Sequence, residues 1–195
     1  MSRAREELEA LAGEPVGEIT ASSGDDPTAG RLHIGTEAAL HRLSSADAVA
    51  FLDFDQELLA PRYRAAEQAL ALLARAARLV RRRAGHGRLL VQTRVPDHPV
   101  LVTAASADPD RLVSSEAPLR RALALPPTTA MALVSGAAAP AFLDLLGSPP
   151  GVQVLGPSDG AWRLTAADHT TLCDALAAVE RPPGRLRIEV DPLGI

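Results

Sequence analysis

The residues best suited to chemistry in this sequence are five arginines: Arg75, Arg78, Arg81, Arg82 and Arg83. If the segment is helical, residues 75, 78 and 82 share one face, because side chains three, four and seven positions apart lie above one another. An arginine can donate two parallel hydrogen bonds to one phosphate, so this face favours contact with a nucleic-acid backbone. The alternative is a solvated helix end, where cations interact favourably with the helix dipole. The chain has one Trp, one Tyr and three Phe, so base stacking on aromatic side chains is scarce.

Carboxylates, histidines and the cysteine offer weaker candidates. Asp53 and Asp55 follow an apolar run and have the ligand type that Mg²⁺ prefers, but polar residues end strands routinely and no phosphate loop accompanies them. His98, in the turn 96–99, could act as an acid–base group, although capping a turn is the commoner role. Cys173 is the single cysteine, which excludes an intrachain disulfide and a structural zinc cluster. We expect Cys173 to be a small buried apolar residue and predict no metal site.

The composition excludes several functions. The chain has 195 residues, 20 arginines, no lysine and a net charge of −4. Without lysine, neither a G-x-x-x-x-G-K-[ST] phosphate loop nor a lysine Schiff base can form. The negative charge excludes general polyanion binding and limits any nucleic-acid surface to a local patch. No apolar run reaches the ~18–20 residues of a membrane span, and residues 1–7 lack a signal core, so we expect a cytoplasmic protein.

The elements that would position the arginines alternate between helix and strand over residues 1–97. Helices are predicted over 4–12, 38–43 and 61–83, and strands over 15–20, 31–36, 48–52 and 89–91. The run 48–52 is continuously apolar, as in a strand buried on both faces of a parallel sheet. Pro61 suits the first turn of the long helix. This order predicts an α/β layer with a partial parallel sheet.

The rest of the chain has a different order. A helical connector is predicted over residues 98–126, interrupted near Pro109 and at Pro118 and ended by Pro126-Pro127. Over 127–195 the expected strands are 130–134, 152–155, 161–164 and 186–190, with helices at 139–146 and 166–179. This βαββαβ order is the split βαβ arrangement, which predicts a small α+β domain with a four-stranded antiparallel sheet and two helices on one face.

Several segments, taken in order, resemble one family. They are Arg5–Leu11, Ile34–Glu37, Phe51–Asp55, Tyr63–Glu67, Leu90–Thr93 with Pro96–Pro99, Leu125–Pro127 and Val190–Pro192. At this spacing they resemble the C-terminal part of primosomal protein N′, the replication-restart DNA helicase. The resemblance covers nearly the whole chain. It implies a remnant of the second motor lobe, followed by the connector and the family's C-terminal domain.

The resemblance also implies what the chain would lack. The family's ATP-binding loop, its Mg²⁺-holding acidic motif and its zinc-binding cysteines would all lie upstream. The family uses ATP, Mg²⁺ and structural zinc, whereas this chain would hold no cofactor itself. In the family, the C-terminal domain helps to bind branched DNA and docks the single-stranded-DNA-binding protein.

Two motor motifs depart from the family pattern. Gly35 and Thr36 match the beginning of the family's G-T-Q motif, with Glu37 in place of the glutamine. The family's Q-x-x-G-R-x-G-R motif falls on residues 75–82, where Arg82 alone keeps its type. In the family these arginines stabilise charge at the γ-phosphate. We therefore expect Gly35, Thr36 and Arg82 to be remnants of a degenerate motor.

Three functions are compatible with these residues. The first is the DNA-binding portion of a primosomal helicase in replication restart, without ATPase or helicase activity by itself. It would bind forked or single-stranded DNA weakly through the five arginines, together with the single-stranded-DNA-binding protein and other primosome components. The second is one chain of a split ATP-dependent 3′-5′ DNA helicase, with an upstream lobe on another polypeptide. The third is a protein-interaction module without DNA binding, favoured by apolar surface that a missing lobe would expose.

Overall fold

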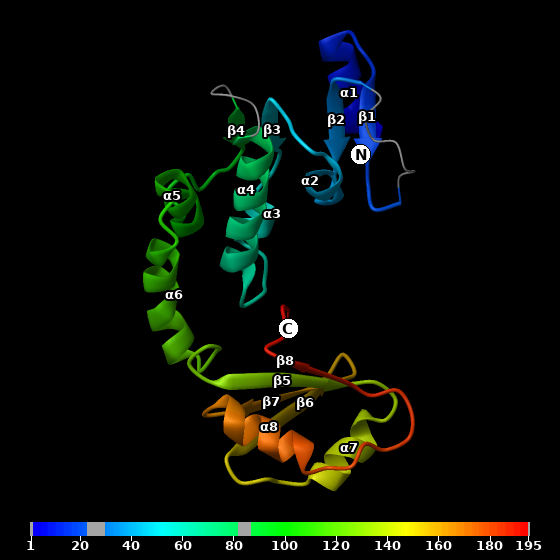
Figure 1. Cartoon of the computed structure of the whole chain (residues 1–195), viewed down its shortest axis with the longest axis vertical. Helices are drawn as coiled ribbons and strands as arrows, with labels where there is room; N and C mark the ends of the chain where they lie inside the picture. The colour runs from blue at the N-terminus through cyan, green and yellow to red at the C-terminus, as the bar shows by residue number, and fades with distance from the viewer. Residues whose placement is uncertain (1, 23–29, 82–86, 195) are drawn as a thin grey trace. The chain divides into compact units, whose positions relative to one another are not determined.

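The computed structural model describes residues 2–22, 30–81 and 87–194, which form two compact units (Figure 1). The first unit comprises Met1–Ala60 and Ala65–Asp108, and the second comprises Pro61–Arg64 and Pro109–Ile195. The division after Asp108 falls inside the segment 98–126, so the predicted connector is shared between the two units. None of the helices in the described part of the chain has the length and apolarity that a bilayer span requires.

The first unit alternates between helices and short strands, as the sequence predicts. Its elements are α1 (Ser2–Ala12), β1 (Val16–Ile19), β2 (Leu32–Gly35), α2 (Ala38–Arg42), β3 (Ala48–Phe51), α3 (Asp55–Leu58), α4 (Ala65–Arg81), β4 (Arg88–Val91) and α5 (Pro99–Ser106). In the described part of this unit, β1 pairs with β2 and β3 pairs with β4, both in parallel. The mixed α/β class is confirmed, but the parallel strands form two separate pairs.

The prediction that residues 48–52 are buried on both faces is wrong. Val49 and Phe51 pack against a cluster of Leu40, Ala76 and Leu79, which comes from α2 and α4. These helices cover one face of the β3–β4 pair. On the other face, Leu90 is 56% exposed, and Leu52, directly after β3, is 60% exposed. The continuous apolar run therefore reflects an uncovered face rather than burial on both sides.

Helix α4 begins at Ala65, four residues later than the sequence predicts. The preceding segment, Pro61–Arg64, belongs to the second unit. There the Tyr63 hydroxyl donates a hydrogen bond to the carbonyl oxygen of Pro192. The Arg120 guanidinium donates to the Tyr63 carbonyl oxygen over 3.3 Å. These tertiary hydrogen bonds hold the segment outside the helix, even though Pro61 suits a first helical turn.

The second unit has the predicted βαββαβ order. Its elements are α6 (Asp110–Ala122), β5 (Ala130–Ser135), α7 (Ala139–Leu146), β6 (Val152–Ser158), β7 (Ala161–Ala166), α8 (His169–Ala177) and β8 (Arg187–Val190). The strand order is β6-β7-β5-β8, with every neighbouring pair antiparallel. Phe142 of α7 and Leu172 of α8 share one core with Leu164 of β7, so both helices cover the same face (Figure 1). The predicted four-stranded antiparallel sheet is confirmed.

The predicted interruption at Pro118 is wrong, because α6 runs through it. A proline inside a helix removes a backbone donor and costs roughly 3 kcal/mol. Tertiary contacts on both sides of Pro118 offset this cost. Leu112 is buried before it, and Arg120 is buried after it. The Arg120 guanidinium also donates to the Pro126 carbonyl oxygen over 2.9 Å, which fixes the last turn.

Candidate nucleic-acid interface

Helix α4 positions the arginine cluster that the sequence singles out. This 17-residue helix is rich in alanine and leucine, which favour helix formation. Its buried face includes Ala69, Leu73 and Ala76, and Arg75 and Arg78 are exposed. Arg81 is its last residue. Arg82 and Arg83 lie outside the described residues, so the structure places Arg75 and Arg78 on the predicted face and does not test the other side chains.

A series of polar contacts joins Arg75 of α4 to the segment that follows β2. Its Nη1 lies 2.6 Å from Nδ1 of His41 on α2. A guanidinium can only donate hydrogen bonds, so Nδ1 accepts and Nε2 carries the proton of the neutral ring. His41 Nε2 lies 3.4 Å from Oε1 of Glu37, one turn earlier in the sequence. We call these residues the Glu37–His41–Arg75 chain. The Glu37 to His41 spacing of four residues is the sequence signal for its first link.

Gly35 and Thr36 lie where β2 ends and the chain turns into α2. A Cβ at Gly35 would come within 2.4 Å of the Ile19 carbonyl oxygen and 2.9 Å of Ala39 Cβ. The Thr36 N–H donates to the same Ile19 oxygen over 3.1 Å. Glycine is therefore required here by the close approach of β1 and α2. The exposed carboxylate of Glu37 follows directly and disfavours a phosphate at this turn.

Asp55 makes a second polar cluster at the carboxyl ends of β3 and β4. One of its oxygens accepts a hydrogen bond from Thr93 Oγ1 over 2.5 Å, and the other accepts from the backbone N–H of Arg94 over 3.0 Å. The Thr93 hydroxyl, followed by the Arg94 N–H, lowers the pKa of Asp55 below its ordinary value. The neighbouring Asp53 accepts from Gln56 Nε2 over 2.6 Å. Both carboxylates thus accept hydrogen bonds that link local segments of the first unit.

Two further candidates have structural surroundings that define their local role. His98 is the N-cap of α5, and its Nδ1 accepts a hydrogen bond from the Val100 N–H over 3.3 Å. The capping interpretation of His98 is confirmed. Cys173 is exposed on α8, so the expectation of a buried cysteine is wrong. Leu172, the residue before Cys173, lies on the buried face of α8 instead. Across the described residues, no group of three or more His, Cys, Asp or Glu side chains is arranged to hold a metal ion.

The fold and these contacts define a mixed α/β protein with exposed arginines on α4 and a separate βαββαβ unit. No protein-family model matches the sequence, and no curated protein sequence matches it either. The segment after β2 and the middle of α4 share a surface, because the Glu37–His41–Arg75 chain connects α2 to α4.

Proposed function

We propose that this chain is the DNA-binding C-terminal portion of a replication-restart helicase of the primosomal protein N′ type, without ATPase or helicase activity by itself. The observation that carries the proposal is the 2.6 Å hydrogen bond between Arg75 and His41. It joins Arg75 to His41, which also contacts Glu37, so two segments that resemble motifs acting on one nucleotide lie close together. This contact supports a common origin of the surface with a helicase motor.

The same surface has chemistry unsuited to ATP hydrolysis. The residue at the family's first arginine position is Leu79, which is 7% exposed and packs with Leu40 and Ala76. A buried leucine cannot stabilise charge on a transferred phosphoryl group. Glu37 places a carboxylate beside the turn after Gly35, and His41 engages Arg75. These features support a motor remnant that has lost catalysis.

The arginines of α4 instead suit the backbone of nucleic acid. Arg75 and Arg78 are exposed one turn apart on the same helix, and arginine contacts phosphates without reading sequence. The net charge of −4 makes long-range attraction weak. Binding through a few phosphate contacts should weaken as the salt concentration rises, with a slope set by the number of contacts. Forked or single-stranded DNA, in company with the single-stranded-DNA-binding protein and the other primosome components, is the proposed partner set. The proposed location is the cytoplasm, and the chain needs no cofactor for this role.

A second candidate function has its own observation. The outer face of the β3–β4 pair exposes Leu90, and Leu52 is exposed directly after β3. An upstream lobe on a separate polypeptide would cover such a surface, as in a split helicase or an interaction module. Hydrolysis of ATP on mixing the chain with that polypeptide would support the split enzyme. Binding to that polypeptide without hydrolysis and without DNA would support the interaction module.

The test of the proposed function is a salt titration of DNA binding. Fluorescence anisotropy with a labelled fork that has single-stranded arms would compare the chain with the Arg75→Gln/Arg78→Gln double variant. Losing two phosphate contacts should weaken binding and reduce the slope of log K against log salt by about 1.4 to 1.8. The matched control, Arg3→Gln/Arg121→Gln, removes the same charge from exposed positions in each unit.

The control variant should keep the original slope. Equal loss in both double variants would assign binding to net charge alone and would contradict the α4 interface. An ATPase assay on the chain with forked DNA should show no hydrolysis above the buffer rate. Hydrolysis by the chain alone would contradict a degenerate motor.

A further inference from the structure

We propose that the open face of the second unit binds one unstacked base of single-stranded DNA in a pocket over the end of β7. This inference rests on the proposed function and names the ligand of a second site. The pocket has a volume of about 400 Å³, within the ~300–1,000 Å³ of small-ligand sites. Its lining residues are Ala124, Thr129, Gly151, Val152, Gln153, Thr165, Ala166 and Ala167.

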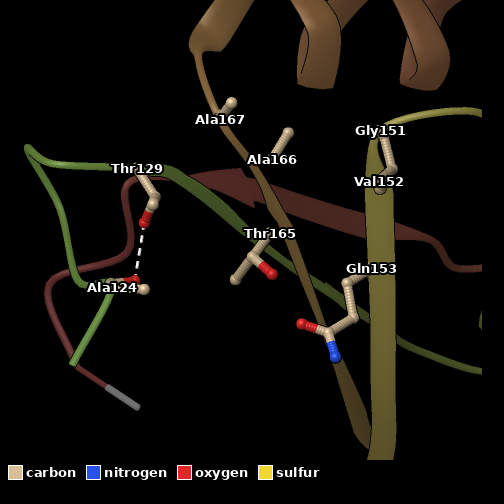
Figure 2. A pocket seen from close by; sticks show the side chains of 8 residues that line it. All are labelled: Ala124, Thr129, Gly151, Val152, Gln153, Thr165, Ala166 and Ala167. Atoms are coloured by element: carbon tan, nitrogen blue, oxygen red, sulfur yellow. Dashed lines mark hydrogen bonds between the residues drawn. The ribbon is translucent and has the colours of Figure 1, made fainter. Parts of the chain in front are cut away.

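Three segments of the second unit build this pocket (Figure 2). Residues 165–167 of β7 and the following turn form its floor. Residues 151–153, at the beginning of β6, form one wall, and Ala124 and Thr129 of the loop before β5 form the other. Half of the eight lining residues are alanine or glycine, so the space between the walls stays open to a flat ring.

The polar groups of the pocket match the edge of a nucleobase. Gln153 and Thr165 are direct partners in the β6–β7 pairing, so their side chains project from the same face of the sheet. Figure 2 shows the Gln153 carboxamide and the Thr165 hydroxyl facing the same space. A glutamine carboxamide donates and accepts in the pattern that adenine N6 and N7 require. Thr129 Oγ1 donates to the Ala124 carbonyl oxygen over 2.6 Å, which leaves its lone pairs as acceptors.

The charge distribution also fits a nucleotide. Each residue that lines the pocket is uncharged, which favours a neutral ring over a phosphate or a carboxylate. Arg163 lies two positions before Thr165 on β7, on the same face and about 6.6–6.8 Å along the strand. A guanidinium there is within reach of the phosphate of a nucleotide whose base occupies the pocket. Arg163 and Glu189 lie in one row across the sheet, because both are partners of Leu133 on β5. The Glu189 carboxylate forms an ion pair with Arg187.

The position of the pocket argues against a peptide strand as its ligand. A peptide gains most of its affinity for a sheet from main-chain hydrogen bonds at an outer edge. Strand β7 is paired on one side with β6 and on the other with β5, so it has no free edge. Strand β7 thus offers a ligand no ladder of main-chain hydrogen bonds, and the Gln153 and Thr165 side chains remain to contact a base edge. Without an aromatic side chain in the lining, hydrogen bonding rather than stacking should set the preference among bases.

The experiment compares the binding of two labelled oligonucleotides of about 12 nucleotides, poly(dA) and poly(dT), a length within the site sizes of single-strand binders. The full chain should bind the adenine strand about fivefold more tightly or better, because a good carboxamide pair discriminates by that factor. Gln153→Leu and Thr165→Val should remove the preference by weakening poly(dA) binding to the level of poly(dT) binding. Thr170→Val is the matched control, since Thr170 is exposed at the beginning of α8, a helix that covers the opposite face.

A second variant keeps the test independent of folding. Gln153 is exposed, so Gln153→Glu should fold normally, and it should lose the adenine preference because glutamate can only accept from a base. Equal binding of both strands by the chain and by Gln153→Leu would overturn the inference but leave the proposed DNA binding intact. Absence of binding to either strand and to forked DNA would contradict both proposals. If Gln153→Leu instead weakened binding of the single-stranded-DNA-binding protein and left DNA binding unchanged, the pocket would be a protein-docking site and the inference would be overturned.

Discussion

The two units of this chain differ in how completely their strands are paired and their sheet faces are covered. We call the second unit, which is paired and covered more completely, the more closed unit. In the second unit, β7 and β5 are paired on both sides, and α7 and α8 cover one face over a buried core that includes Phe142, Leu164 and Leu172. In the described part of the first unit, the strands form two parallel pairs, so every strand has an unpaired edge. Isolated pairs of strands are marginally stable, and parallel sheets usually have both faces covered. The second unit therefore has the features of a self-sufficient domain, whereas the described part of the first unit leaves strand edges unpaired and one face of the β3–β4 pair exposed.

The two observations on which the functional proposals rest, the segments that resemble a motor and the pocket beside Gln153, lie in different units. The segments that resemble a motor, around Gly35 and Arg75, lie in the less closed unit. Motor catalysis needs several groups fixed around one nucleotide. Under the proposed function Leu79 would occupy one of those positions, and its side chain packs in the core with Leu40 and Ala76. The more closed unit has the predicted βαββαβ fold and the pocket beside Gln153. The proposed base pocket therefore lies in the second unit, whereas the proposed arginine interface lies in the first.

The largest expected change in the free energy of unfolding comes from creating a cavity in the core of the second unit. Phe142 is fully buried in it, and Phe142→Ala should lower the free energy of unfolding by about 3–5 kcal/mol through lost burial and a cavity. Leu90→Ala on the exposed face of the β3–β4 pair should change it by less than about 0.5 kcal/mol. Urea unfolding by circular dichroism measures both. Fluorescence of Trp162, the single tryptophan and a residue of β7, reports on the second unit by itself.

The next effect concerns Arg120, which is 5% exposed. It donates to the carbonyl oxygens of Pro126 and Tyr63 and lies 3.5 Å from the Glu116 carboxylate. Arg120→Met should destabilise the second unit by about 3 kcal/mol, because it leaves a partly buried carboxylate and two carbonyls without their donor. The neighbouring Arg121 is exposed, so Arg121→Met is the matched control and should be close to neutral. Similar Trp162 unfolding curves for both variants would show that Arg120 does not anchor the segment 61–64.

The contrast between the units also explains what the sequence could predict. The helix predicted over 139–146 is found with the same bounds, because alternating apolar residues, prolines and glycines mark local structure in the second unit. The beginning of α4 was not predictable, because Tyr63 is held by Pro192, 129 residues away. The link between His41 and Arg75 spans 34 positions and depends on helix packing. Local patterns specify elements, and contacts distant in sequence decide where they end and which polar groups meet.

A smaller effect should follow from filling the turn at Gly35. An added Cβ would contact the backbone oxygen of Ile19 at 2.4 Å, and a backbone atom cannot move aside like a flexible side chain. Gly35→Ala should destabilise the region around β1 and β2 by about 1–3 kcal/mol. Hydrogen exchange of the amides of these strands should accelerate, while exchange in β5 and β7 stays unchanged. Gly194→Ala is the control, because no heavy atom lies within 4 Å of its ideal Cβ.

The smallest effect is a difference in pH dependence between one carboxylate of each unit. In the first unit, the Thr93 hydroxyl is the leading cause of the lowered pKa of Asp55. In the second unit, the backbone N–H of Thr171 is the leading cause of the lowered pKa of Asp168, which caps α8 over 2.8 Å. Thr93→Val should therefore raise the pKa of Asp55 strongly. Thr171→Val should raise the pKa of Asp168 less, because the backbone donor remains.

The sign of the stability change follows from these lowered values. A carboxyl whose pKa is lower in the folded than in the unfolded chain stabilises the fold above the unfolded value, here about 3.8, and loses this contribution as the pH falls through the folded pKa. Thr93→Val should thus reduce stability near neutral pH, and its difference from the original chain should shrink as the pH falls from the unfolded value through the folded pKa. NMR titration of both carboxyls, with urea unfolding at several pH values, measures the two effects. A larger pKa change at Asp168 than at Asp55 would mean that side-chain hydroxyls, rather than backbone donors, fix the polar turns of the more closed unit.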